Sequence, residues 1–208
     1  MIISVTKEVD GKTIPTAMTV VAPEQEQPIE ALEEVAADAG VEGRALSDLL
    51  SAFVTHERDG VHLYRTVAAR TSNDEWRKRY EEFGAETAEH VQIYEQLIEM
   101  LGGDPAYVSP SARMTTYRAT KLLESALLSG SVSPDALDLV DLEAVLIAEA
   151  KCHENWEFLG ELAEMLPEGS TQDAILAAVE EVEDDEDKHL EWARTSWREA
   201  LTRMVMQR

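Results

Sequence analysis

The stretch from Val179 to Ala193, VEEVEDDEDKHLEWA, places ionisable side chains where a helix should be dry. Around it, apolar or small residues recur at alternating steps of three and four: Ile175, Val179, Val182, Ala193 and Ser196. This spacing predicts the stripe that an amphipathic helix turns toward a core. Glu186 and His189 continue the same rhythm. Since burying an unpaired carboxylate costs several kcal/mol, the pair predicts a partner charge or a bound metal ion.

A solvated acidic face is the plainer interpretation of this stretch. Its acidic residues are Glu180, Glu181, Glu183, Asp184, Asp185, Glu186 and Asp187. Like charges one helical turn apart repel each other, and a bound cation relieves that repulsion. The choice between the two interpretations depends on whether other helices carry polar groups on their apolar faces.

Two predicted helices in the first half of the chain carry such groups. The first, from Ser47 to about Arg70, has a stripe of Leu46, Leu50, Phe53, Glu57, Val61, Tyr64 and Ala68. The second is predicted to open with a capping box at Ser72-Asn73-Asp74-Glu75 and to end at Gly102-Gly103. His90 lies on its stripe, and Glu86 lies beside the stripe four residues earlier.

The third long helix is predicted to begin at Ser133-Pro134, with serine as cap and proline in the first turn. Its stripe contains Glu149 and His153. For His153 a satisfied core histidine, a metal ligand and a contact to a ligand all stay open. The fourth helix, from about Thr171 toward Met204, carries Glu186 and His189.

These elements predict an all-α fold. Residues 104–133 form a long connection with one crossing helix over 112–128, so two helix hairpins are joined by a long crossover, which is a known four-helix-bundle topology. Residues 1–45 are predicted to be an N-terminal arm, and residues 46–208 the bundle. In the arm, two strand-like segments flank a hairpin turn at Asp10-Gly11, and a short helix follows from Ile29 to Ala39.

The candidate ligands also fall at matching heights. In an antiparallel hairpin, residues equidistant from the turn lie level with each other. The midpoint of Glu57 and His90 falls in the predicted turn at 72–74, and that of Glu149 and His189 falls at Gly169. Each hairpin therefore brings one carboxylate level with a histidine, which predicts a buried polar site between the helices.

The pattern resembles the ferritin-like di-metal carboxylate proteins, which include rubrerythrins, bacterioferritins and manganese catalases. That group supplies one Glu from each of two helices and a Glu-x-x-His from each of the other two. The resemblance implies that Glu57 and Glu149 match the single glutamates and that Glu186 and His189 match one Glu-x-x-His. His90 matches the second histidine, but Thr87 stands where its glutamate belongs, and Glu86 is the candidate replacement.

The resemblance implies two transition-metal ions, iron first and manganese or zinc as alternatives, held by carboxylate and imidazole ligands. The expected function is an oxidoreductase acting on iron(II), peroxide or oxygen, in a homodimer or higher homo-oligomer. Metal storage or detoxification is one alternative. A non-catalytic bundle that serves as a dimeric interaction module, with hydrogen-bonded polar core groups, is the other.

Composition limits the remaining classes. The 18 basic against 42 acidic residues give a net charge of −24, which disfavours nucleic acid and anionic membranes as partners. The start of the chain has no basic region followed by a long apolar run, so we expect a soluble cytoplasmic protein. Cys152, the single cysteine, is expected to be a buried inert thiol. Tyr64 and Trp156 lie seven residues after Glu57 and Glu149, and core packing or electron relay are their two interpretations.

Overall fold

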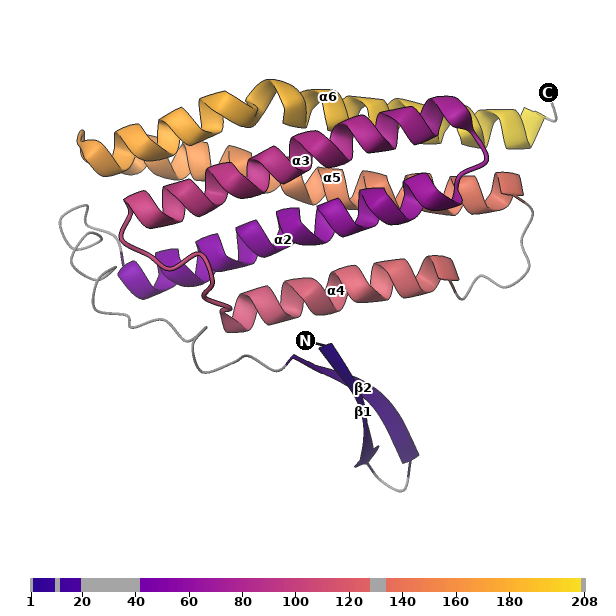
Figure 1. The fold of residues 1–208 in the computed structure, drawn as a ribbon, viewed down its shortest axis with the longest axis horizontal. Helices are drawn as coiled ribbons and strands as arrows, with labels where there is room; N and C mark the ends of the chain where they lie inside the picture. Colours follow the sequence, from indigo (N-terminus) through magenta and orange to yellow (C-terminus); the bar gives the residue numbers. More distant parts are fainter. Residues whose placement is uncertain (1, 10–11, 20–41, 128–133, 207–208) are drawn as a thin grey trace.

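The computed structural model describes residues 2–9, 12–19, 42–127 and 134–206. From residue 42 on, the described chain is all-helical, which confirms the predicted all-α class. Its helices are α2 (Gly43–Arg70), α3 (Asp74–Met100), α4 (Pro110–Leu127), α5 (Pro134–Met165) and α6 (Ser170–Met206) (Figure 1). None of the described helices contains a segment sufficiently long and apolar to cross a bilayer.

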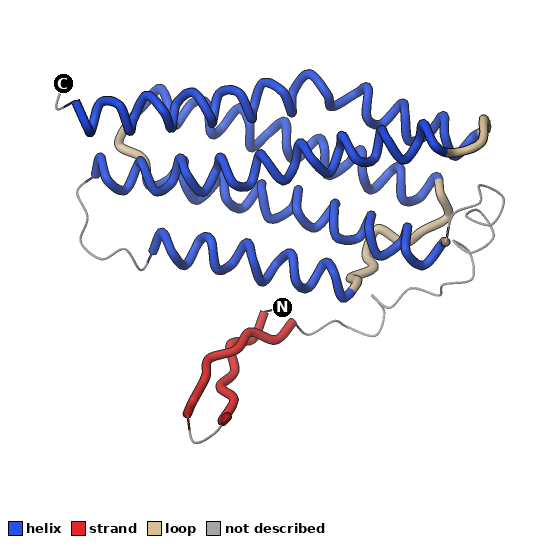
Figure 2. The backbone as a smooth tube through the Cα atoms, turned by 180° about the vertical axis from the view of Figure 1, so that it is seen from behind, coloured by secondary structure: helices blue, strands red, loops and turns tan. Residues whose placement is uncertain are grey.

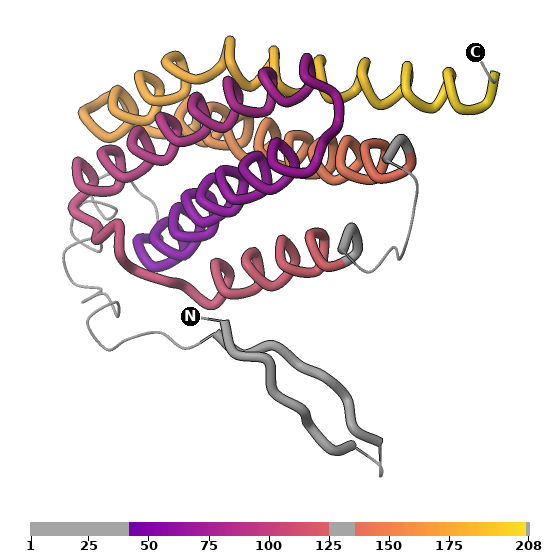
Figure 3. Tube along the Cα trace, turned by 45° about the vertical axis from the view of Figure 1, so that its right-hand side comes forward, coloured from indigo at the N-terminus to yellow at the C-terminus, as the bar shows by residue number. Residues whose placement is uncertain are grey.

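The helices form two hairpins that pack side by side. α2 pairs with α3, and α5 pairs with α6, while α2 also contacts α5 and α3 contacts α6 (Figure 2). α4, the predicted crossing helix, lies mainly against α2 and touches α5 along one side (Figure 3). Four long helices therefore surround a shared interior, and α4 lies outside it.

The interior holds two separate apolar clusters. One contains Leu50, Tyr94, Leu159 and Val182, and the other contains Leu63, Phe83, Leu142 and Ala193, each cluster taking residues from α2, α3, α5 and α6. On every one of these helices the candidate metal ligands fall between the residues of the two clusters. The predicted common height is therefore a polar layer with apolar core on both sides.

The predicted capping box at the start of α3 is wrong by one residue. Asn73, rather than Ser72, is the N-cap: its backbone is extended, and its Oδ1 accepts from the amides of Glu75 and Trp76 at 3.0 and 3.2 Å. Ser72 instead donates weakly to Asp138 at 3.4 Å. An asparagine oxygen reaches the first free amides of a helix as well as a serine hydroxyl does, so either residue was chemically able to cap.

The end of α3 follows the prediction. The helix ends at Met100, Gly102 adopts φ 81°, and the amide of Gly103 donates to the carbonyl of Ile98 at 2.8 Å. That is the left-handed cap for which glycine is suited. α2 begins at Gly43 rather than Ser47, because the Glu42 side chain accepts from the amide of Ala45 at 2.6 Å.

Strands β1 (Ile2–Val9) and β2 (Lys12–Thr19) pair antiparallel, with Ile2 opposite Thr19 and Val9 opposite Lys12. The predicted turn at Asp10-Gly11, the predicted helix from Ile29 to Ala39 and the predicted cap at Ser133 lie outside the described residues.

Replacing Asn73 with alanine is expected to lower the free energy of unfolding by about 1 kcal/mol, because two amides lose their capping acceptor. Urea denaturation monitored by circular dichroism measures the change. Ser72→Ala is the matched control and should change it by a few tenths at most, since surface substitutions away from caps are nearly neutral. An equal loss in both variants would restore Ser72 to the cap.

Candidate metal centre

The polar layer brings together six buried side chains from four helices. They are Glu57 on α2, His90 on α3, Glu149 and Cys152 on α5, and Glu186 and His189 on α6, each no more than 5% exposed. Five of them are predicted ligands, and the sixth is the cysteine. Each lies on the stripe that its helix turns inward, so the periodicity of apolar residues positions them.

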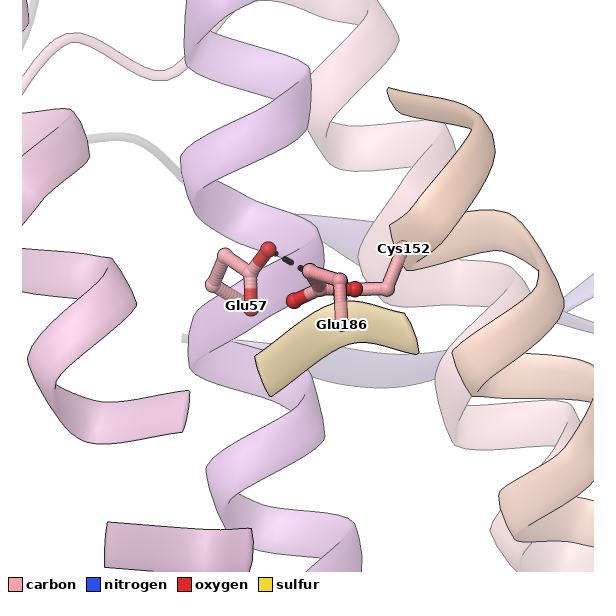
Figure 4. Close-up of side chains that lie close together, drawn as sticks. All are labelled: Glu57, Cys152 and Glu186. Carbon is pink, nitrogen blue, oxygen red and sulfur yellow. Dashed lines mark hydrogen bonds between the residues drawn. The ribbon is translucent and has the colours of Figure 1, made fainter. Parts of the chain in front are cut away.

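Glu57, Cys152 and Glu186 form the tightest group (Figure 4). One ligand atom from each lies within 4.8 Å of the other two. The Cys152 thiol donates to Glu57 Oε1 at 2.8 Å, and Trp156 Nε1 donates to the same oxygen at 2.9 Å. Glu57 Oε2 and both oxygens of Glu186 have no hydrogen-bond partner among the described residues.

The rings of the two histidines stack on each other, with 5.9 Å between their centroids. His90 Nδ1 lies 2.9 Å from Glu186 Oε1, without the alignment that a hydrogen bond requires, and its Nε2 lies 3.7 Å from Asp185 Oδ2. His189 Nδ1 lies 3.5 Å from Glu149 Oε2, and its Nε2 lies 2.8 Å from Glu86 Oε2. In both histidines Nδ1 faces an interior carboxylate.

These contacts are reciprocal between the two hairpins. Glu86, four residues before His90, contacts His189, and Asp185, four residues before His189, approaches His90. Seven residues after each single glutamate stands an aromatic donor for the other one, as Tyr64 donates to Glu149 at 2.7 Å while Trp156 donates to Glu57. The layer therefore has a pseudo-two-fold arrangement, which the sequence spacing alone only suggests.

The two hairpins differ at two pairs of corresponding positions. Glu186 and Cys152 stand in the α5–α6 hairpin, where Thr87 and Gly60 stand in the α2–α3 hairpin. Thr87 is buried, and its hydroxyl donates to the carbonyl of Phe83 at 2.8 Å. A Cβ on Gly60 would lie 3.3 Å from the Thr87 methyl group, so this corner is closely packed and has no acidic side chain.

Two predicted ligands contact groups outside the carboxylate cluster. Glu86 Oε2 lies 2.8 Å from His189 Nε2, and its Oε1 accepts from the Lys188 ammonium at 2.6 Å, so both of its oxygens have partners on α6. His153 Nε2 lies 2.9 Å from Asp187, and its Nδ1 lies 3.5 Å from Glu157. From α3, Glu86 therefore supports a histidine of α6, and His153 on α5 lies at the edge of the layer.

Burial dominates the ionisation of the layer. It raises the pKa of Glu57 to about 8, with the charge of Glu186 adding to the effect, and raises that of Glu186 to about 8, with the charge of Glu149 adding to it. Burial also lowers the pKa of His90. For His189 burial alone would act in the same way, but the nearby carboxylates of Glu149 and Glu86 raise its pKa. The pKa of the Cys152 thiol lies well above its usual range because of burial and the neighbouring carboxylates.

The donor set fits a metal ion better than it fits a closed hydrogen-bond network. Seven buried atoms of the layer have no hydrogen-bond partner among the described residues: Glu57 Oε2, His90 Nδ1 and Nε2, Glu149 Oε2, both oxygens of Glu186, and His189 Nδ1. Buried polar groups are normally satisfied, and each orphan costs about 1–3 kcal/mol. Carboxylate oxygens and imidazole nitrogens are ligands that iron, manganese and zinc accept.

Sequence reasoning missed the parts that four residues take in this layer. Cys152 lies three residues after Glu149 and therefore on the same helical face, which was the available signal. The roles of Tyr64 and Trp156 as donors to the opposite carboxylate, and of Asp185 as a neighbour of His90, had no such signal, because they depend on contacts between hairpins.

Comparison with known proteins adds no relative. No family model, no curated protein and no solved structure matches the chain.

In metal-free protein, stability should fall as pH rises from about 6.5 to 8. Glu57 and Glu186 have folded pKa values near 8 against an ordinary value of 4.5, so the folded state holds protons that the unfolded state has lost. His189, with its raised pKa, acts in the same direction. The low pKa of His90 acts oppositely, but only below about its ordinary value of 6.5.

Urea denaturation of chelator-treated protein at several pH values tests this expectation. Glu57→Gln should flatten the slope by up to about 1.4 kcal/mol per pH unit, because one proton no longer binds on folding. The exposed Glu99 on α3 provides the matched control, Glu99→Gln, which should keep the wild-type slope. A Glu57→Gln protein with an unchanged slope would show that Glu57 is ionised when folded.

Proposed function

We propose that the chain is a ferritin-like four-helix bundle that binds two transition-metal ions in the polar layer and acts as an oxidoreductase on iron(II), peroxide or oxygen. The observation that carries the proposal is the set of seven buried ligand atoms, on four helices, that have no hydrogen-bond partner among the described residues. A purely structural polar core would pair these atoms with each other, and the interaction-module alternative depends on such pairing.

Two ions suit the distribution of donors. Glu57 and His90 serve one half, and Glu149 and His189 serve the other. Glu186 lies against both Glu57 and His90, and its charge also acts on Glu149 and His189, so it is the candidate for a shared ligand. Three carboxylates would offset most of the charge of two divalent ions, which lowers the cost of burying them.

The surrounding residues hold these donors in place. Tyr64 and Trp156 each fix one oxygen of a glutamate and leave the second oxygen to face the layer. Glu86 at Nε2 of His189 and Asp185 near Nε2 of His90 leave the Nδ1 atoms facing inward, as partners of ligand histidines commonly do. The apolar clusters on both sides keep water away. A bound pair of redox-active ions would supply the electrons that oxygen or peroxide accepts.

Cys152 is a further candidate ligand for the ion beside Glu57 and His90, because its thiol lies in the group with Glu57 and Glu186. A metal ion lowers the pKa of a coordinated thiol and releases its proton. The thiol's hydrogen bond to Glu57 provides a nearby acceptor for that proton. A soft sulfur ligand in one half alone would make the two ions inequivalent.

Saturable metal binding should depend on the buried glutamates of the layer and should not depend on His153. Iron(II) titration under anaerobic conditions, followed by elemental analysis, is expected to give about two ions per chain in wild type. Glu57→Ala and Glu186→Ala should remove saturable binding, whereas His153→Ala should retain it, because His153 contacts Asp187 and Glu157 instead. Wild-type binding in both glutamate variants would refute the proposed site.

Cobalt(II) gives a spectroscopic test of the thiol. Cobalt-loaded wild type is expected to show a near-ultraviolet sulfur-to-cobalt charge-transfer band, since Cys152 lies within the Glu57–Glu186 group. Cys152→Ser should lose that band and keep the weaker visible bands of bound cobalt. Visible bands without the charge-transfer band in wild type would leave the site intact and exclude the thiolate ligand.

A further inference from the structure

A large groove lies outside the polar layer, between α4 and α5 and over α2. Its volume is about 920 Å³, within the range of small-molecule sites. Its apolar wall includes Phe53 and Leu63 from α2, Met114 and Leu122 from α4, and Ile147 from α5. Met114 and Ile147 are 50% and 52% exposed, so the groove keeps apolar side chains in contact with solvent.

The floor of the groove is closed toward the metal centre. His56 on α2 lines the groove, and its Nε2 donates to the carbonyl of Ala148 on α5 at 3.0 Å. Burial lowers the pKa of His56. His56 and Ala148 line the groove and directly precede Glu57 and Glu149 in the sequence. Consecutive residues of a helix lie on different faces, so the groove and the polar layer are separate sites.

The charge of the groove is opposite to that of the chain. Among the described residues that line it, Arg118, Lys121 and Lys151 are basic and Asp59 is acidic, while the whole chain carries −24. Lys121 is paired with Glu124 at 2.6 Å. Arg118 on α4 and Lys151 on α5 both line the groove and make no ion pair within the described residues. The Lys151 ammonium contacts Asn155 Oδ1 and lies 5.2 Å from the centre of the Phe53 ring, so neither cation has an anionic partner among these residues.

An occupant with an apolar body and one anionic head satisfies both features. Its chain would cover the exposed Met114 and Ile147, and its head would pair with Arg118 and Lys151, the two cations that line the groove from α4 and α5. We propose that this groove binds a long-chain carboxylate, with the carboxylate between Arg118 and Lys151 and the hydrocarbon chain along the apolar wall.

Calorimetric titration of the full chain with dodecanoate tests the proposal, with dodecanol as the uncharged probe. Dodecanoate should bind saturably, and dodecanol should bind more weakly by about tenfold, since a charged hydrogen bond is lost. Arg118→Ala and Lys151→Ala should weaken dodecanoate binding by about the same factor. Arg65→Ala, which removes an exposed cation of α2 that does not line the groove, should leave it unchanged.

Ala119→Phe places a bulky ring in the groove from the peripheral helix α4 and should weaken both probes. Equal affinity of wild type for dodecanoate and dodecanol would overturn the proposal, and this comparison needs no variant to fold. An Arg118→Ala protein that binds dodecanoate as wild type does would also overturn it. If dodecanoate fails to bind and Ala119→Phe turns a dimer into a monomer in sedimentation velocity, the groove is an interface between two copies.

Discussion

Three carboxylates buried in one layer are the constraint on which the interior of this protein depends. Glu57, Glu149 and Glu186 are each at most 4% exposed, and apolar clusters lie above and below them. Burying one charge in such surroundings costs several kcal/mol, and neighbouring like charges add to the cost. The chain meets that cost in part with protonation, since the pKa values of Glu57 and Glu186 lie near 8, and with donors from Tyr64, Cys152 and Trp156. Metal ions would meet the remainder.

The same layer combines symmetry with one local difference. His90 and His189 each have an acidic neighbour from the other hairpin, and Glu57 and Glu149 each accept a hydrogen bond from an aromatic side chain of the other hairpin. Glu186 and Cys152 break the equivalence, because Thr87 and Gly60 occupy the matching corner with close packing and no acid. The proposed centre therefore has two similar histidine sites, but the thiol of Cys152 lies only on the side of Glu57. We therefore expect the two ions to bind with unequal affinity.

The spacing of apolar residues and the distances from the hairpin turns were sufficient to predict an all-α fold and to place five of the six buried layer residues on inward faces. They work because a helix repeats at a fixed angle, so a polar residue on an apolar stripe is visible in the sequence. Cys152 was overlooked because its side chain resembles an apolar one and does not interrupt a stripe. Glu86 was expected to lie in the same sector as His90. Its carboxylate instead contacts His189 on α6, and this contact depends on how the two hairpins pack. The cap at Asn73 rather than Ser72 depends on the backbone of a single turn residue.

Anomalous diffraction from crystals of the iron-loaded protein, collected on both sides of the iron absorption edge, tests the proposed centre most directly. Two anomalous peaks should lie within the polar layer, one between Glu57, Glu186 and His90 and one between Glu149, Glu186 and His189, with the peak on the Cys152 side of higher occupancy at limiting iron. Peaks confined to the exposed acidic surface of α6, or no peak in the layer at saturating iron, would contradict the assignment and leave the layer as a protonated structural core.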